Sequence, residues 1–412
     1  EEAVEEYFDM LIKSRFIEMF GHIGLNEKNL PVMSLGDICS MITDGSHYSP
    51  IDEPGEPYPM LSVKDLSDGA FDYHNCKYIG QKAYDKLVKE GCKPLRNDVL
   101  IAKDGSVFQK SMVVSDEKDQ VILSSIAILR PDLDIIDPIY LNQCLMSDYI
   151  KEDVIRNYTT GTAIRRIILK NLTKLQLAVP EIQYQNQFAD FVKQVDKSKA
   201  ICKQIFQSFD NLVKSRFIEM FGSPDNNRYD LPVETLNQLT MGKLTYGIAA
   251  SAIDYDGKTR YIRITDIDED GNLNDDYKSP DEYDEKYLLN DGDILFARSG
   301  ATVGKTFQYS SKYGQALYAG YLIRSIPDVN KILPKYLLYA TKSAYYNKCI
   351  EKLRRGATQP NINAQQYGSL EFLVPPLDQQ ESFVNFVQQV DKSKFEVVQS
   401  LLKLKDSMKS SQ

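Results

Sequence analysis

The sequence predicts an α+β protein in which two mixed α/β domains are separated by long, repeated helices that form an antiparallel coiled coil. Two observations support this prediction. The segment KSRFIEMFG, from Lys13 to Gly21, recurs unchanged 201 residues later, from Lys214 to Gly222. The segment FADFVKQVDKSK, which begins at Phe188, recurs as FVNFVQQVDKSK from Phe383, 195 residues later. Repeated segments that occur in the same order along the chain indicate that the whole domain-and-helix unit is duplicated.

The segments between the repeated helices are also related, but more weakly. NDVLIAK at 97–103 corresponds to GDILFAR at 292–298, and each domain closes on a Val-Pro pair, at 179–180 and 374–375. The change of offset from 201 to 195 places loops of different length in the two domains. We therefore expect an N-terminal helix at 1–22 that is a partial copy, domains at 30–180 and 231–375, a central helix at 181–222 and a C-terminal helix at 376–412.

The divergence of the domains beside nearly identical helices has two explanations. Surface loops drift faster than packed helices. Alternatively, the domains bind different ligands while the helices bind the same partner twice. An unchanged segment of nine residues favours the second explanation, because packing alone does not require identity.

The central repeated segment has the pattern of a long amphipathic helix. It contains no Gly or Pro from Glu181 to Phe221, and Gly222 and Pro224 follow it as termination signals. About 40 helical residues span roughly 60 Å, which suits a spacer. Residues 1–21 match only the end of this helix, and we expect them to pack alongside the coiled coil. The predicted apolar stripe consists of Phe188, Val195, Cys202 and Phe209 at heptad spacing, with Phe191, Ile205 and Leu212 three positions further on.

Within the domains, short apolar runs predict strands and proline-initiated segments predict helices. The strands are expected at 99–102, 121–129 and 294–297, bounded by Asp-Gly turns such as 104–105, 270–271 and 291–292. The helices are expected at 138–154 and 334–353, each with proline in the first turn.

The composition narrows the class of protein. Hydrophobic residues make up 42% and charged residues 26% of the 412 residues, which is typical of a globular protein. Apolar runs are far shorter than the roughly 20 residues that a bilayer requires, and no signal region is visible, so we expect a cytoplasmic protein. Six scattered cysteines and three scattered histidines predict reduced thiols and no metal site.

No catalytic constellation stands out in the sequence, and we predict no catalytic residue. The segment from Gly300 to Thr306 resembles a phosphate-binding loop, but Ser299 occupies the position where the motif requires its first glycine. A glycine-rich turn or a loop that faces DNA is the favoured interpretation.

Several polar and basic segments suit contact with DNA. The run TDGSHY at 43–48 offers hydroxyls and an imidazole, although an ordinary surface turn has the same composition. Basic residues gather late in each domain, beside a Gly-Thr or Gly-Ala-Thr turn. By residue type, Gln359 and Asn361 suit adenine edges, whereas Arg263 and Arg298 suit guanine. The candidate DNA-contacting residues are Thr43, Asp44, Ser46, His47, Tyr48, Lys64, Lys103, Arg165 and Arg166 in the first domain, and Thr245, Tyr246, Arg263, Thr265, Arg298, Ser299, Thr302, Arg354, Arg355, Thr358 and Gln359 in the second.

Taken in order, these motifs give the sequence a family resemblance. The resemblance rests on the two KSRFIEMFG blocks, on TDGSHYSP at 43–50, on SVKDL at 62–66, and on NDVLIAKDG and GDILFARSG in the middle of the two domains. The late blocks at 161–180 and 356–375 complete the pattern. With these features the chain resembles the specificity subunit of type I restriction-modification systems over essentially its full length.

The resemblance implies two target-recognition domains that each read one half of a split, asymmetric sequence in double-stranded DNA. It also implies two kinds of partner. These are two methyltransferase subunits that use S-adenosylmethionine, and restriction subunits that translocate DNA with ATP and Mg²⁺. No cofactor is expected on this chain itself.

Two alternatives from other classes remain open at this point. The net charge of −9 favours a scaffold that binds only proteins, because DNA binding depends on basic residues. The distribution of charge matters more than its sum, however. An ATPase built on the loop at Gly300 is the other alternative.

Overall fold

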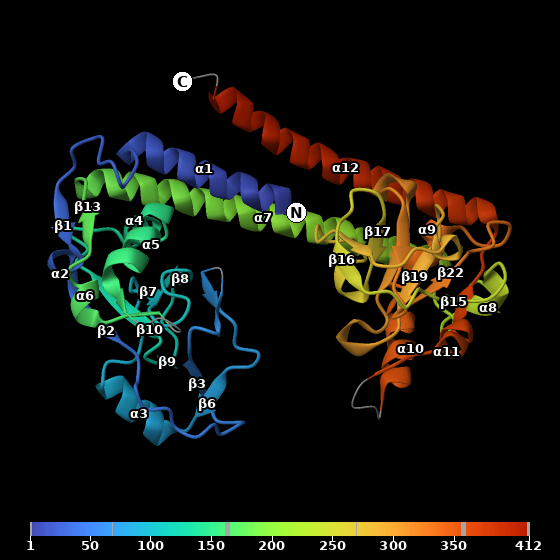
Figure 1. Cartoon of the computed structure of the whole chain (residues 1–412), viewed down its shortest axis with the longest axis horizontal. Coiled ribbons are helices and arrows are strands. Elements are labelled where there is room, and N and C mark those ends of the chain that lie inside the picture. Colours follow the sequence, from blue (N-terminus) through green and yellow to red (C-terminus); the bar gives the residue numbers. More distant parts are fainter. Residues whose placement is uncertain (1, 68, 161–164, 269, 356–359, 410–412) are drawn as a thin grey trace. The chain divides into compact units, whose positions relative to one another are not determined.

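The computed structural model describes residues 2–67, 69–160, 165–268, 270–355 and 360–409, with side chains described between residues 4 and 400 of these ranges. The chain divides into two compact units, residues 1–202 and 203–412. The boundary lies within the long helix α7 (Ile182–Phe221), so each unit contains one globular domain and one part of α7 (Figure 1).

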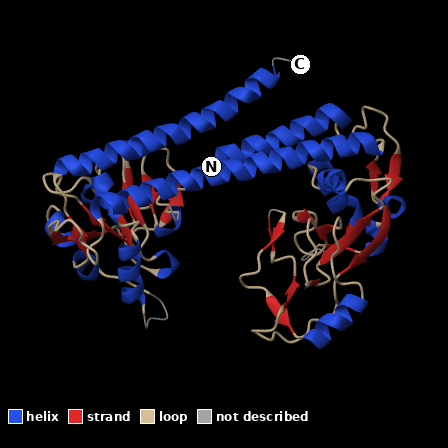
Figure 2. Cartoon of the chain, turned by 180° about the vertical axis from the view of Figure 1, so that it is seen from behind, coloured by secondary structure: helices blue, strands red, loops and turns tan. Residues whose placement is uncertain are grey.

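Unit 1 is a mixed α/β structure in which the strands gather in the globular part and the long helices lie beside it (Figure 2). Its main sheet has the antiparallel order β2-β10-β7-β8, and a second sheet has the order β6-β3-β9 with β3 and β9 parallel. The elements are α1 (Glu2–Phe20), β1 (Val32–Ser34), α2 (Leu35–Ile38), β2 (Cys39–Asp44), β3 (Tyr58–Leu61), β4 (Leu66–Ser67), β5 (Ala70–Phe71), β6 (Lys77–Ile79), α3 (Gln81–Lys89), β7 (Val99–Ala102), β8 (Ser111–Val113), β9 (Val121–Ile122), β10 (Ile126–Pro131), α4 (Pro138–Leu145), α5 (Asp148–Asp153), a π-helical turn (Val154–Tyr158), β11 (Thr159–Thr160), β12 (Arg166–Ile167), α6 (Leu169–Leu172) and β13 (Gln176–Ala178).

Unit 2 repeats this plan. Its main sheet has the order β15-β22-β19-β20, and β17 pairs in parallel with β21 as β3 does with β9. The elements are β14 (Val233–Thr235), α8 (Leu236–Leu239), β15 (Thr245–Tyr246), β16 (Ala252–Asp254), β17 (Arg260–Ile262), β18 (Lys278–Pro280), β19 (Ile294–Ala297), β20 (Thr306–Gln308), β21 (Ala316–Tyr318), β22 (Leu322–Ser325), α9 (Pro334–Ala340), α10 (Ala344–Arg354), α11 (Ala364–Gly368), β23 (Glu371–Leu373) and α12 (Leu377–Lys409), with 3-10 turns at Ile264–Asp266, Glu285–Tyr287, Gly300–Thr302 and Ser311–Tyr313.

The α+β class predicted from the sequence is confirmed, and the strands at 99–102 and 294–297 have the predicted bounds. The predicted helices at 138–154 and 334–353 are each divided in two. Ser147 and Ser343 begin new helices, because their hydroxyls accept hydrogen bonds from the backbone N–H of Ile150 and Tyr346. The predicted strand at 121–129 is likewise divided into β9 and β10.

In each unit, two long helices pack in antiparallel fashion. In unit 1, Phe16 of α1 lies against Phe188 of α7, with ring centroids 5.3 Å apart. In unit 2, Phe217 of α7 lies at the same 5.3 Å from Phe383 of α12. Lys394 of α12 forms a 2.5 Å ion pair with Asp210 of α7. Offset and edge-on ring contacts of this kind contribute about 0.5–1.5 kcal/mol beyond the burial of their area.

The buried stripe of α7 differs in part from the predicted one. Phe188, Val195 and Cys202 are buried as expected, but Ile205 and Leu212 are 37% and 48% exposed. The neighbouring Phe206 and Val213 are buried instead. The second apolar residue of each heptad therefore lies four residues after the first, and not three as predicted. Both spacings place the two residues on the same face of a helix.

A buried glutamine joins each domain to its helix. In unit 1, Gln185 of α7 accepts a hydrogen bond from the backbone N–H of Asp137, at the start of α4, at 2.9 Å. Its amide nitrogen donates to the carbonyl oxygens of Pro180 and Ile135 at 2.7 and 3.0 Å. In unit 2, Gln380 of α12 makes the corresponding bonds with Leu333 N–H and with the carbonyls of Pro375 and Lys331.

We expect Gln185→Leu to lower the free energy of unfolding by about 3 kcal/mol, because a buried donor and buried acceptors lose their partners. Urea denaturation of the full chain measures the change. Gln187→Leu is the matched control, because Gln187 lies on the same helix and is exposed. An equal loss in the two variants would contradict this role of Gln185.

Candidate DNA interface

In unit 1, several candidate residues meet at one end of the main sheet. β2 ends at Asp44, and Lys103 directly follows β7. This end of the sheet is remote from α7, because β10 runs from it toward Pro131 and on to the Gln185 contact at Asp137. Lys103 Nζ lies 3.1 Å from Asp44 Oδ2. It lies 3.6 Å from Oδ1 of Asp104, which is also 3.6 Å from Nε of Arg166.

Burial differs sharply within this group. The Lys103 side chain is only 8% exposed and that of Asp44 11%, whereas that of Arg166 is 59% exposed. Lys103 is therefore held by two carboxylates inside the domain, and Arg166 presents its charge at the surface.

The run at 43–48 contributes fewer free groups than predicted. Ser46 is buried, and its hydroxyl donates to the Tyr48 carbonyl at 2.6 Å and accepts from the Tyr48 N–H. His47 is exposed and lies 3.3 Å from Asp44, and Tyr48 is 61% exposed. Thr43 is half-buried within β2. Only His47 and Tyr48 of this run are therefore fully open to a ligand.

Unit 2 has a corresponding group at the same end of its sheet. Arg298 directly follows β19, and its guanidinium lies 4.6 Å from the ring centroid of Tyr246, at the end of β15. Arg298 Nε donates to Asn361 Oδ1 at 3.2 Å. Ser299 and Asn361 form a backbone bridge, as Asp104 and Arg166 do in unit 1. The guanidinium is thus held between an aromatic face and an amide.

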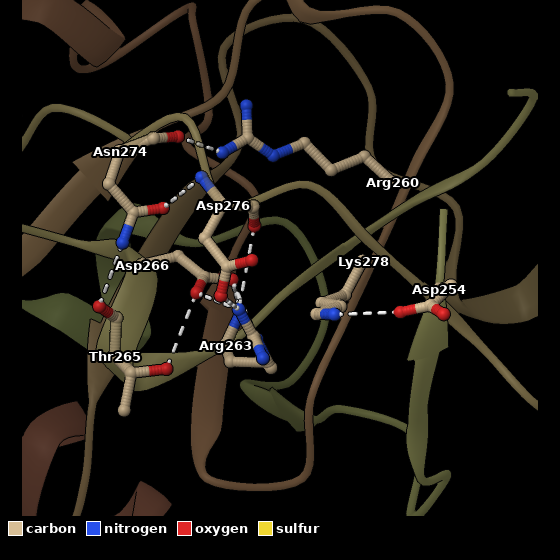
Figure 3. Close-up of polar contacts among 8 residues, drawn as sticks. All are labelled: Asp254, Arg260, Arg263, Thr265, Asp266, Asn274, Asp276 and Lys278. Atoms are coloured by element: carbon tan, nitrogen blue, oxygen red, sulfur yellow. Dashed lines mark hydrogen bonds and ion pairs between the residues drawn. The ribbon is translucent and has the colours of Figure 1, made fainter. Parts of the chain in front are cut away.

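Arg263 is already engaged by carboxylates of its own unit (Figure 3). Its guanidinium donates to Asp266 at 2.6 and 3.0 Å and to Asp276 at 2.8 Å, and these bonds raise its pKa further. Thr265 donates to Asp266 at 3.3 Å. Beside them, Arg260 is buried with its guanidinium 4.1 Å from the Tyr277 ring centroid. Guanine recognition by Arg263 would first require these ion pairs to open.

The remaining candidates are spread over both domains. Lys64, Arg165, Thr245 and Arg355 are exposed, and Ser299, Thr302 and Arg354 are half-buried. Thr358 and Gln359 lie outside the described residues. The structure brings Asp44, His47, Lys103 and Arg166 together in unit 1, and Tyr246, Arg298 and Ser299 in unit 2.

Comparison with known proteins decides the family. The model of the type I restriction modification DNA specificity domain matches twice, at residues 27–208 and 245–404, and the two matches cover most of the chain. The chain belongs to this family.

Curated relatives agree with the match. The chain is 21% identical over 354 residues to the type I restriction enzyme MjaVIII specificity subunit of Methanocaldococcus jannaschii, covering 81% of this chain and 82% of the relative. It is 24% identical over 365 residues to the StySPI specificity subunit of Salmonella potsdam, covering 81% and 75%. A solved structure from a study of complex assembly and conformational transition of the type I R-M system is similar in fold, with a TM-score of 0.53, 15% identity and coverage of 92% and 96%.

Burial suppresses thiolate formation at three cysteines of this specificity subunit. All six cysteines are free. Burial raises the pKa of Cys92 to about 11 and that of Cys39 and Cys144 to about 12, so the reactive thiolate is scarce near neutral pH. Among the described residues, no group of three or more His, Cys, Asp or Glu side chains is arranged to hold a metal ion. In the same part of the chain, no helix has the length and apolar character to cross a membrane.

The loop at Gly300 does not have the architecture of a phosphate-binding loop. In that motif the lysine leads into a helix whose N-terminus faces the phosphates. Here Lys305 leads into strand β20, and its amine donates to the Ile267 carbonyl at 3.3 Å. The favoured interpretation, a glycine-rich turn or a loop that faces DNA, agrees with this geometry.

We expect the purified chain to show no ATP hydrolysis and Lys305→Ala to leave that result unchanged, because the loop does not begin a helix. Phosphate release measured with Mg²⁺ and ATP checks this. Turnover that disappears in Lys305→Ala would restore the ATPase alternative.

Sequence reasoning missed three residues beside these groups: Asp104, Ser125 and Tyr321. The carbonyl of Tyr321 accepts the Arg298 N–H at 3.0 Å, and its side chain is 61% exposed. Asp104 lies one residue beyond Lys103, at the position that Ser299 occupies in unit 2. A signal for Asp104 was present, because the match between 97–103 and 292–298 extends by one residue to this pair. The sequence gives no comparable signal for Tyr321.

Proposed function

We propose that this specificity subunit reads a bipartite, asymmetric sequence in double-stranded DNA, with one half read by each domain. The observation that carries the proposal is the duplication: two units share one fold, and candidate groups of different chemistry occupy the same end of the same sheet. Equivalent scaffolds with different side chains suit recognition of two different half-sites. The chain performs no catalysis in this proposal.

We assign partner binding to the duplicated helices. Ile17 of α1 and Ile218 of α7 occupy the same position of the repeated segment and are 42% and 48% exposed. Beside them, Arg15 pairs with Glu18 at 2.7 Å and Arg216 pairs with Glu219 at 2.8 Å. The same surface is thus present in each unit. A surface that occurs twice fits two copies of one partner, which we identify as the methyltransferase subunit.

A groove in unit 2 borders this surface. It has a volume of about 440 Å³ and is lined by Arg216 of α7 and by polar residues of α12 such as Glu381 and Gln389. Restriction subunits complete the proposed assembly in the cytoplasm. S-adenosylmethionine, ATP and Mg²⁺ belong to the partners in this proposal, and none is assigned to this chain.

We expect the subunit, assembled with its methyltransferase partner, to bind mixed-sequence duplex with an affinity that falls steeply as salt rises. Lys and Arg residues release counterions from the phosphates that they neutralise, which produces this dependence. Gel shifts over a range of salt concentrations measure it. Absence of binding even at low salt would favour the scaffold that binds only proteins, which the net charge of −9 otherwise supports.

We expect exchange of residues 231–375 for the matching domain of another specificity subunit to change one half of the recognised sequence only. The reason is that each domain has its own sheet and its own candidate group. Mapping of methylated adenines in cells that carry the hybrid subunit gives the readout. A change in both halves would contradict the assignment of one reader to each domain.

A further inference from the structure

We propose that five matched positions in each unit form its base-reading site. They are named here the strand-end clusters and consist of Asp44, Lys103, Asp104, Ser125 and Arg166 in unit 1, and Tyr246, Arg298, Ser299, Tyr321 and Asn361 in unit 2. The proposal rests on the proposed function and deepens it, because it assigns the difference between the half-sites to these side chains.

The backbone frames of the two clusters correspond bond by bond. The N–H of Lys103 donates to the Ser125 carbonyl at 3.0 Å, and that of Arg298 donates to the Tyr321 carbonyl at 3.0 Å. The Lys103 carbonyl accepts from Ile167 at 3.0 Å, just as that of Arg298 accepts from Ile362 at 2.8 Å.

The strands that end at Asp44 and Tyr246 also correspond. The residue after each is glycine, and Gly45 and Gly247 both donate to the first residue of the neighbouring strand, Ile126 or Leu322, at 3.2 Å. A Cβ atom on either glycine would lie 2.2 Å from a carbonyl oxygen, so both strand ends have space for glycine alone.

Although the frames match, every side chain at the five positions differs. The strands that lead into them do not diverge in this way: VLIA at 99–102 and ILFA at 294–297 are both fully buried and apolar. Packing in the core therefore keeps the strands apolar in both units. Packing does not explain why Lys103, between two carboxylates, corresponds to Arg298, which lies against a tyrosine ring. Differences in ligand chemistry explain an exchange at all five positions.

The unit 2 cluster presents donors in a prearranged geometry. The Arg298 guanidinium is oriented by the Tyr246 ring and by Asn361, and the side chains of Tyr246, Tyr321 and Asn361 are exposed. An arginine fork matches the O6 and N7 acceptors of guanine, and asparagine matches the N6 and N7 edge of adenine. We assign purine edges in the major groove to this cluster.

The unit 1 cluster combines acceptors with donors, because its carboxylates are paired with Lys103 and with the exposed Arg166. Asp44 and Asp104 place two carboxylates around the buried Lys103 amine. Asp104 Oδ1 accepts no hydrogen bond in the described part of the chain, but it is buried 3.6 Å from Lys103 Nζ and from Arg166 Nε, so a base edge reaches it only when the exposed Arg166 moves aside. Carboxylates are repelled by phosphates but accept from the amino group of cytosine. We therefore assign a base edge with an exocyclic amino group to unit 1. The two clusters then favour different bases, which makes the target asymmetric.

The test uses the full subunit assembled with its methyltransferase partner, and compares the methylated motif and the Kd for the cognate duplex. We expect Arg298→Ala to weaken cognate binding roughly 5- to 150-fold and to relax one position in one half-site. The other half-site should stay unchanged. Arg298→Lys should lose the same discrimination, because it keeps the charge but lacks the planar fork.

Lys258→Ala is the matched control, because it removes one exposed positive charge from unit 2 outside the cluster. We expect it to leave the motif unchanged. Asp104→Asn should relax one position of the opposite half-site. Thermal unfolding of each variant shows whether it remains folded, and Arg298→Lys carries the test if Arg298→Ala does not.

Three outcomes would overturn the assignment. The first is an unchanged motif and wild-type affinity in the Arg298 variants. The second is an equal loss of affinity of these variants for all DNA sequences, which indicates a phosphate contact. The third is relaxation of the same half-site by the Arg298 variants and Asp104→Asn. The first two outcomes leave the proposed function standing, because the wild-type complex still reads its target. The third also contradicts the assignment of one reader to each domain. A wild-type complex without sequence preference would instead remove the proposed function itself.

Discussion

The structure of each unit depends on a buried glutamine that joins a domain to its long helix. Gln185 and Gln380 use both ends of their amides to bind three backbone groups, from the end of the last strand to the start of α4 or α9. A buried amide is stabilising only when its donors and acceptors are satisfied together, so it fixes direction as well as distance. The neighbouring phenylalanine rings supply the apolar area but tolerate more geometries. The glutamines thus determine how each sheet is oriented on its own helix.

With that orientation fixed, the two ends of each sheet have separate roles. One end leads through β10 or β22 to the glutamine and the helix pair, whose sequences are closely similar in the two units. The other end carries Lys103 or Arg298, whose surroundings differ completely. The separation lets one surface stay constant for partners while the other changes for DNA. Duplication made this arrangement visible, because each unit serves as the internal reference for the other.

The sequence predicted the duplication, the fold class and the strands at 99–102 and 294–297, because these depend on local pattern and apolar periodicity. It did not predict that Ile205 and Leu212 are exposed, since both spacings on a helix face are compatible with the sequence, and packing selects one. The candidate site was predicted in part. Lys103 and Arg166 lie together in unit 1, and Arg298 lies at the equivalent strand end of unit 2, but Ser46 turns its hydroxyl inward. Arg263 is bound by Asp276, 13 residues away in sequence and close only after folding.

The close approach of Gly45 and Gly247 to the neighbouring carbonyls has a consequence for the side chains around them. Because the glycine that follows each strand is held by backbone contacts, the strand end keeps its position while the side chains around it differ between the two units. Substitutions in such a frame alter the chemistry of the strand end, but a lone change of Asp44 would leave the buried Lys103 charge without its 3.1 Å partner. One backbone frame can therefore carry two different sets of side chains, and both sets occur within this single chain.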